Sequence, residues 1–212
     1  KIKLLASLPF SRKLQYIENL YFKLKAKTLY QFVFKQFGGG SVVRSPLLLT
    51  PEFICLGRQV FIWDDARIEA IGTHNNEKYN PSIVIGDRVT IQQRCHITAA
   101  DKLVIGNDSL ISFDVMIQDT DHCYQDVSTP IAHQNLSLSK TEIGEACFIG
   151  SGAKIQAGTI LGKHCVVGAN SVVRGHYPDF CVLVGSPARV VKRYNKKSKT
   201  WERTNKNGDF LI

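Results

Sequence analysis

The sequence predicts a mainly β protein built as a parallel β-helix, and two observations in residues 143–178 carry this prediction. An aliphatic side chain recurs every six residues, at Ile143, Ile149, Ile155, Leu161, Val167 and Val173. A small residue follows each of the first five after four positions, at Cys147, Ala153, Thr159, Cys165 and Ser171. This period fits neither a helix nor an alternating strand. A fixed short repeat is typical of a stacked solenoid, so we expect three sextets to close each triangular coil.

The same pattern continues upstream of this run. Its aliphatic positions form three further triplets, Leu56–Ile62–Ile68, Ile85–Ile91–Ile97 and Ile105–Ile111–Ile117. With the six sextets above they make fifteen sextets, or about five coils. A β-sandwich with frequent turns does not predict six-residue spacing over such a length. We therefore place the β-helix at residues 46–192, with a loop extruded at 118–142.

Charge is distributed unevenly along the 212 residues, whose net charge is +9. Residues 1–44 carry +8 and residues 189–212 carry +6, which leaves −5 on residues 45–188. This balance argues against a nucleic-acid groove on the repeat. It permits the basic ends to contact anionic lipid or another polyanion, and equally to be solvated tails. We expect residues 193–212 to be a basic, partly disordered tail.

The cysteines indicate a reducing compartment. None of the six forms a C-x-x-C pair, and Cys95, Cys147 and Cys165 occupy the small inward position of the repeat. A buried thiol there behaves as a small hydrophobic group. The start, Lys1–Phe10, lacks the apolar run of a secretory signal, and no stretch is long enough to span a bilayer. These features predict a cytoplasmic protein.

Residues 1–45 read as a helical, basic N-terminal segment. Within 10–37, apolar side chains recur at spacings of three and four, which predicts one or two amphipathic helices. Such a segment could cap the open end of the β-helix, whose strand edges would otherwise be unpaired. It could also lie on the surface of a membrane, peripherally, through its lysines and aromatic side chains.

The period breaks at two main places, where loops are expected. The first is the polar stretch Gly72–Ser82, and the second runs from Ile117 to Ile143, beginning Gln118-Asp119-Thr120-Asp121-His122. A long excursion from a regular solenoid is usually functional. The second loop is therefore the first place to look for an active site.

These features together resemble a known family. The six-residue repeats, the Asp-Thr-Asp-His sequence at 119–122 and the terminal Gly-Ser-Pro-Ala-Arg-Val-Val-Lys at 185–192 are similar to hexapeptide-repeat acyltransferases. The branch that they resemble is that of the sugar O-acetyltransferases acting on capsule, exopolysaccharide or lipopolysaccharide units. The resemblance implies a left-handed β-helix, a homotrimer, and acetyl-CoA bound between subunits without a metal.

The resemblance also implies a catalytic residue. His122 matches the family's catalytic histidine, and a histidine suits a general base because its pKa lies near neutrality. Asp119 and Asp121 flank it, and either could orient the imidazole, bind the acceptor or form a turn. Asp119 is the weakly favoured choice. Tyr79, in the first loop, is a second candidate for contact with the acceptor.

The remaining site positions come from the CoA side of the family pattern. Ser151 matches the backbone N–H that stabilises the oxyanion, and Ala169 matches a backbone contact with the CoA arm. Arg174, Arg189 and Lys192 match or neighbour basic positions beside the CoA phosphates. Galactoside- and maltose-type enzymes carry an acidic sugar-binding residue where this chain has Ala99 and Ala100, so we expect a different mode of acceptor binding.

The predicted function is O-acetylation of a saccharide by direct attack of its hydroxyl on acetyl-CoA. Two alternatives remain open. A zinc hydratase like the carbonic anhydrases of this fold could use His96, His122 and His133, although the paired-histidine spacing of that class is absent. A non-catalytic trimeric scaffold would need neither His122 nor the CoA-side motif.

Overall fold

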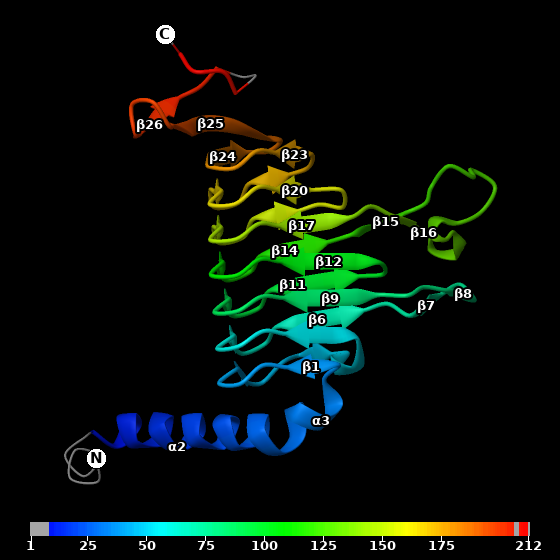
Figure 1. Cartoon of the computed structure of the whole chain (residues 1–212). Coiled ribbons are helices and arrows are strands. Elements are labelled where there is room, and N and C mark those ends of the chain that lie inside the picture. Colours follow the sequence, from blue (N-terminus) through cyan, green and yellow to red (C-terminus); the bar gives the residue numbers. More distant parts are fainter. Residues whose placement is uncertain (1–8, 206–207, 212) are drawn as a thin grey trace.

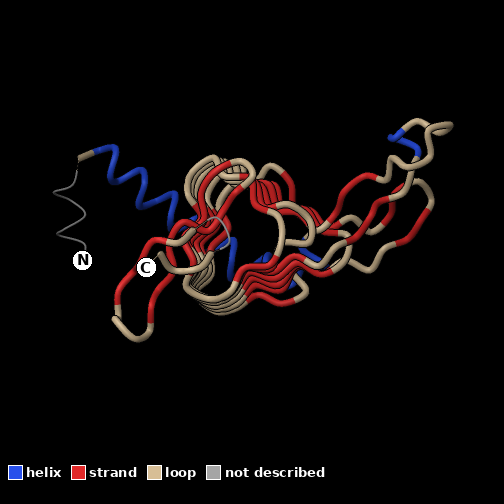
Figure 2. Tube along the Cα trace, turned by 90° about the horizontal axis from the view of Figure 1, so that it is seen from above, coloured by secondary structure: helices blue, strands red, loops and turns tan. Residues whose placement is uncertain are grey.

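The computed structural model describes residues 9–205 and 208–211. Residues 1–8, which include most of the segment considered for a secretory signal, lie outside this description, as do 206–207 and 212. The chain folds as a left-handed parallel β-helix, a triangular prism whose coils stack along one axis (Figure 1). Seen along this axis in Figure 2, the strands form three stacked groups.

Each side of the prism is one sheet of parallel strands from successive coils. The first sheet contains β1 (Gln36–Phe37), β4 (Ile54–Leu56), β9 (Ser82–Ile85), β12 (Lys102–Ile105), β17 (Thr141–Ile143), β20 (Ile160–Leu161) and β23 (His176–Tyr177). The second begins with β2 (Val42–Val43), β5 (Phe61–Ile62), β10 (Thr90–Ile91), β13 (Leu110–Ile111), β18 (Phe148–Ile149), β21 (Val166–Val167) and β24 (Cys181–Gly185). The third contains β3 (Leu48–Leu49), β6 (Arg67–Ala70), β11 (His96–Ala99), β14 (Met116–Gln118), β19 (Lys154–Ile155) and β22 (Val172–Val173).

The inward register predicted from the repeat is confirmed. All fifteen aliphatic repeat positions are buried, and so are the small positions between them. Equivalent positions pair in register, as Ile111 does with Ile149 and Ile149 with Val167. Cys95, Cys147 and Cys165 are buried in this column. The core is therefore one continuous stack of aliphatic and small side chains.

The β-helix is longer than the sequence analysis expected. Within the described residues, six coils are complete and a seventh is begun by β23 and β24. The expected start at residue 46 is too late, because β1 and β2 already pair in parallel with β4 and β5. The first coil escaped detection because Val43 and Leu49 are its only inward aliphatic residues that keep the six-residue spacing.

The N-terminal segment forms α2 (Phe10–Lys25), the π-helix η1 (Ala26–Tyr30) and the short α3 (Gln31–Val33). Tyr30 and Phe34 belong to the core cluster, and their rings lie 5.3 Å apart. This part of the segment caps the open end of the prism, as expected. Helix α2 lies across that end and extends beyond it (Figure 1).

The C-terminal residues are more ordered than expected. Strand β24 pairs antiparallel with β25 (Ala188–Asn195), which pairs with β26 (Thr200–Arg203). Trp201 lies over His164, with ring centroids 6.3 Å apart, and meets Tyr194 edge to face at 5.7 Å. The expectation of disorder is thus wrong for residues 193–203, because this aromatic cluster holds the hairpin against the last coils. No helix among the described residues is long and apolar enough to cross a membrane.

Candidate active site

Two hairpin arms leave the prism at the same corner, between the third and first sheets. The short arm, β7 (Thr73–His74) and β8 (Glu77–Lys78), follows β6. The long arm, β15 (Thr120–His122) and β16 (Leu136–Leu138), follows β14. Both project to the same side in Figures 1 and 2. The coils stack the two loop insertions, so segments far apart in the sequence become neighbours.

Hydrogen bonds join the two arms. The Asn75 side-chain amide donates to the carbonyl oxygens of Gln134 at 2.8 Å and Ala132 at 3.1 Å. The Tyr79 hydroxyl oxygen accepts a hydrogen bond from the Leu136 N–H at 3.2 Å. Tyr79, expected as an acceptor contact, therefore holds the long arm to the short one.

Gln134 organises the tip of the long arm and was missed by the sequence analysis. Its side-chain amide donates to the carbonyl oxygens of Asp126 and Thr129, each at 2.8 Å. The Asp126 carboxylate accepts hydrogen bonds from Ser128 and Thr129, which lower its pKa to about 2. The sequence gives no signal for this role, because Gln134 is one polar residue in a polar loop, and nothing along the chain shows that its side chain is buried.

His122 stands at the end of β15 with its side chain exposed. Its imidazole meets that of His74 on the short arm, with ring centroids 5.6 Å apart and planes inclined by 66°. His74 Nε2 lies 3.3 Å from the Gln134 carbonyl oxygen. The predicted catalytic histidine thus lies beside a second histidine, which comes from the short arm.

A cavity of about 500 Å³ opens beside the two histidines. Its floor is the outer face of the third sheet, and its rim is formed by the arms. The floor contributes Arg67, Glu69, His96, Thr98 and Gln118, and the rim contributes Thr73, His74, Thr120, Asp121, His122 and Leu136. Arg67 is paired with Glu69. The lining is rich in hydroxyl, amide and imidazole groups, which suit an acceptor with many hydroxyls.

Asp119 has a structural role, which corrects the expectation that it orients His122 or binds the acceptor. The residue is fully buried, and its carboxylate accepts hydrogen bonds from the N–H groups of Ala100 at 2.8 Å and Asp101 at 3.0 Å. Burial raises its pKa, while those two N–H groups act in the opposite direction. Asp119 therefore stabilises the corner between β11 and β12, away from the cavity.

Asp121 is the aspartate that stays near His122. Its carboxylate forms an ion pair with Arg174 at 2.7 Å and lies 3.4 Å from the Gln118 side-chain amide. Arg174 follows β22 at the corner from which the arms leave. The chain therefore uses Arg174 to hold the base of the long arm, and this geometry does not support its expected contact with CoA.

Ser151 and Ala169 lie at a different corner, between the second and third sheets. They follow β18 and β21 in consecutive coils, and the Ser151 carbonyl oxygen accepts a hydrogen bond from the Asn170 N–H at 2.8 Å. Within the part of the chain that the structure describes, neither Ser151 N–H nor Ala169 N–H has a hydrogen-bond partner. Within a single chain, Ser151 and Ala169 do not lie beside His122, because the third sheet separates their corner from the corner at which the two arms leave the prism.

The two basic residues expected on the CoA side lie on β25. Arg189 and Lys192 are exposed, and Arg189 pairs in register with Val184, at the end of β24. Arg189 also lines a cavity of about 440 Å³ with His176, Pro187 and Arg193. Both cations lie at the C-terminal end of the prism, where Arg189 pairs with Val184 near the corner that follows β24, and Lys192 pairs with Val182, the neighbour of Val166 in β21.

The repeat itself matches a family model. The model described as "Bacterial transferase hexapeptide (six repeats)" matches residues 140–175. Residues 140–175 therefore carry the repeat that this family model describes. One relative is the putative lipopolysaccharide biosynthesis O-acetyl transferase WbbJ of Escherichia coli strain K12. The two sequences are 37% identical over 128 residues, and this aligned region covers 57% of this chain and 65% of WbbJ.

A second relative of the hexapeptide-repeat chain is the probable acetyltransferase Rv3034c of Mycobacterium tuberculosis. It is 34% identical over 155 residues, which cover 72% of this chain and 48% of that protein. The hexapeptide-repeat chain thus spans about half to two thirds of the length of these curated relatives.

Solved structures share the fold of the hexapeptide-repeat chain. The N-acyltransferase AntD of Bacillus cereus, in complex with dTDP and 3-hydroxybutyryl-CoA, superposes with a TM-score of 0.67 at 19% identity, covering 81% of this chain and 89% of AntD. A maltose O-acetyltransferase of Clostridium difficile 630 superposes with a TM-score of 0.58 at 22% identity, covering 87% and 86%. At these identities the likeness concerns the fold alone.

A zinc site, the alternative function, would need several ligands that converge on one point. Of the three histidines named for it, His96 and His122 line the cavity, whereas His133 does not. Among residues 9–205 and 208–211, no group of three or more His, Cys, Asp and Glu side chains is placed to hold a metal ion.

Proposed function

We propose that this chain transfers an acetyl group from acetyl-CoA to a hydroxyl of a saccharide, with His122 as the general base. The observation that carries the proposal is the exposed His122 imidazole beside His74, at the rim of a polar cavity. The relatives named O-acetyl transferase and acetyltransferase support the same class of reaction. A surface-polysaccharide unit is the acceptor that the relation to WbbJ favours.

The proposed reaction is a direct transfer without a covalent enzyme intermediate. Acetyl-CoA supplies an activated carbonyl carbon as a thioester. The His122 imidazole would take the proton of the sugar hydroxyl as its oxygen bonds to that carbon. His122 would then return the proton to the sulfur when the carbon–sulfur bond breaks, so the products are an acetyl ester and CoA thiol.

The Ser151 N–H is suited to stabilise the oxyanion of this reaction. It has no partner among the described residues, so no hydrogen bond has to be broken before it donates to a developing negative charge. The Ala169 N–H, one coil further along the same corner, could bind the CoA arm. Arg189, near the end of this corner, and Lys192, further along β25, could pair with its phosphates.

This assignment requires more than one copy of the chain. His122 and Ser151 lie at different corners of one prism, so a site containing both must be completed by a neighbouring copy. Beyond the first coil, whose Val42 is buried beside α2, the outer face of the second sheet carries an almost entirely apolar ladder suited to such a contact: Phe61, Thr90, Leu110, Phe148, Val166 and Val182. We therefore propose a homotrimer. The reaction would take place in the cytoplasm, and contact with a membrane would involve the basic N-terminal segment.

The test is release of CoA thiol by the purified full chain, screened over glycans, nucleotide-linked sugars and lipid-linked sugars. With an active acceptor, His122→Ala should lower kcat by about 10² to 10⁴ and leave binding of CoA and the trimer intact. His133→Ala is the matched control, because His133 is an exposed histidine of the same arm that does not line the cavity. Near-full thiol release by His122→Ala would overturn the assignment.

A further inference from the structure

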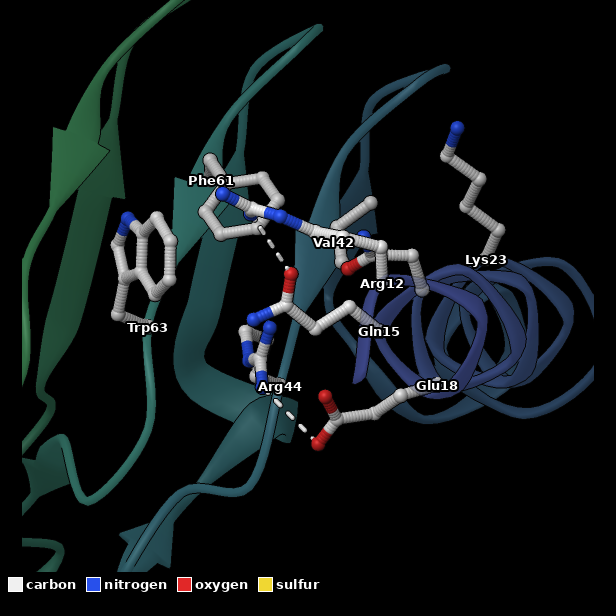
Figure 3. A pocket seen from close by; sticks show the side chains of 9 residues that line it. Arg12, Gln15, Glu18, Lys23, Val42, Arg44, Phe61 and Trp63 are labelled. Atoms are coloured by element: carbon white, nitrogen blue, oxygen red, sulfur yellow. Dashed lines mark hydrogen bonds and ion pairs between the residues drawn. The ribbon is translucent and has the colours of Figure 1, made fainter. Parts of the chain in front are cut away.

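Helix α2 turns a mostly polar side toward the β-helix, and Phe22 is the buried apolar residue of that side. Gln15 and Glu18 line a cavity of about 470 Å³ with Arg44 and Trp63 of the first two coils (Figure 3). The Glu18 carboxylate lies 3.0 Å from the Arg44 guanidinium, which stacks between the rings of Phe22 and Trp63 at 5.1 and 5.3 Å. These contacts fix the rotation of α2 about its own axis.

The opposite side of α2 carries an apolar stripe that nothing in the described structure covers. The outer stripe, as we name it, comprises Phe10, Leu14, Ile17, Tyr21 and Leu24. Their spacing of four, three, four and three places them on one side of a helix. Each of these side chains is between 50% and 75% exposed. A surface helix normally buries such a stripe against its own core, so α2 is amphipathic in the reverse sense.

The surroundings of the outer stripe are basic. Residues 9–35 contain six lysines and arginines and one acidic residue, Glu18, which is already paired with Arg44. Lys13 lies one turn from both Phe10 and Ile17, and Lys25 lies one turn from Tyr21, so both flank the stripe. Exposed apolar and aromatic side chains flanked by lysines are typical of a helix bound to anionic lipid.

We infer that the outer stripe of α2 binds the surface of an anionic lipid bilayer, with the helix lying in the plane of the interface. The helix has 16 residues, about 24 Å at 1.5 Å per residue, and one side of it is held by the protein. Figure 1 shows α2 lying across the end of the prism. The exposure of the stripe side chains places them on the side of α2 that does not contact the coils. This end can therefore rest on a plane.

The charges favour lipid over a second copy of the chain. A second α2 packed on the stripe would bring Lys13 and Lys25 against the same lysines of its partner, and like charges at close range repel. Anionic headgroups would instead neutralise them. The inference does not depend on the proposed acyl transfer, since α2 shares no residue with the His122 cavity.

The test is sedimentation of the full chain with vesicles of phosphatidylglycerol or of phosphatidylcholine. We expect binding to phosphatidylglycerol that weakens with added salt, and little binding to phosphatidylcholine. Ile17→Glu combined with Tyr21→Glu should reduce the affinity about tenfold or more, because two apolar side chains leave the interface. Both positions are exposed, so the fold should persist by circular dichroism.

Val127→Glu combined with Ile131→Glu is the matched control, because it places the same two charges at aliphatic residues of the long arm that are 98% and 55% exposed. It should bind phosphatidylglycerol vesicles as the unmodified chain does. Failure of the unmodified chain to bind phosphatidylglycerol at low salt would overturn the inference, and so would unchanged binding by the double variant. A lower oligomeric state of the double variant without lipid would assign the stripe to a second copy, which also overturns it.

Discussion

The imidazoles of His74 and His122 meet edge to face, with centroids 5.6 Å apart, although they come from different coils. The hydrogen bonds of Asn75 and Tyr79 to the long arm keep the two rings together. His122 is otherwise exposed at the end of a two-stranded arm, where a side chain would be free to rotate. His74 is thus placed to act as a positioning residue for the proposed base.

Replacing His74 tests this role. His74→Ala should lower kcat roughly tenfold to hundredfold while leaving the KM for acetyl-CoA unchanged, because a misplaced base slows proton transfer without touching the donor. His74→Phe keeps an aromatic edge against His122 and should restore most of the rate. Steady-state kinetics of both variants decide the matter. If Phe restored nothing, the contribution of His74 would come from its ring nitrogens and not from packing.

The ion pair of Arg174 and Asp121 should matter for the arm more than for global stability. The pair is largely exposed, and such pairs contribute about 0.2–1 kcal/mol, so Arg174→Ala should change the free energy of unfolding by no more than that. Arg174→Ala and Asp121→Asn should each lower kcat, because the base of the arm loses its link to the coils. Since both break the same link, the double variant should be no slower than the slower single variant. Additive losses in kcat would show that the two residues act separately.

Asp119 should make stability depend on pH in a direction opposite to that of an ordinary paired carboxylate. Burial raises its pKa in the folded state, so the native state holds the proton to higher pH than the unfolded chain does. The stability of the native protein, relative to Asp119→Asn, should therefore fall as the pH rises from the unfolded value near 3.9 through the raised folded value. Urea unfolding of both proteins at acid and neutral pH measures this difference. A difference that grows with pH would contradict the prediction.

Asp119→Ala should destabilise the protein at either pH. It leaves the buried N–H groups of Ala100 and Asp101 without their acceptor, at a cost of about 1–3 kcal/mol for each group left unsatisfied. In the same urea series, a variant as stable as the unmodified chain would rule out the structural role of this carboxylate.

Ile149 and Phe148 are adjacent in the sequence but point to opposite faces of the second sheet. Ile149→Asp places a charge in the core at a cost on the order of 5 kcal/mol or more, and should give insoluble protein. Phe148→Asp changes a side chain that is 41% exposed on the apolar outer ladder, and should fold but fail to form the trimer. Circular dichroism and light scattering after gel filtration distinguish the two results. A folded Ile149→Asp would contradict the register, and a trimeric Phe148→Asp would contradict the proposed interface.

The six-residue period was sufficient to predict the core, because in a solenoid each inward position is set by its place in the local repeat. All fifteen predicted aliphatic positions are buried, and the break in the period located the arm that carries His122. The first coil, at residues 36–49, was missed because the aromatic Phe37 takes one of its three repeat positions and leaves only Val43 and Leu49 as aliphatic residues. The hairpin at the C-terminus was missed because it depends on aromatic contacts such as that of Trp201 with His164.

By itself, spacing along the sequence determined the parallel β-helix, its inward register and the place of the loop that carries His122, whereas the left hand of the helix was implied by the resemblance to a family. Only the tertiary structure decided what surrounds that histidine. The meeting of His74 with His122, the burial of Asp119 and the pairing of Arg174 with Asp121 join segments from different coils. The rotation that exposes the outer stripe of α2 likewise depends on Arg44 of the first coil. Such contacts arise because the coils stack on one another in space, and no periodicity along the amino-acid sequence encodes them.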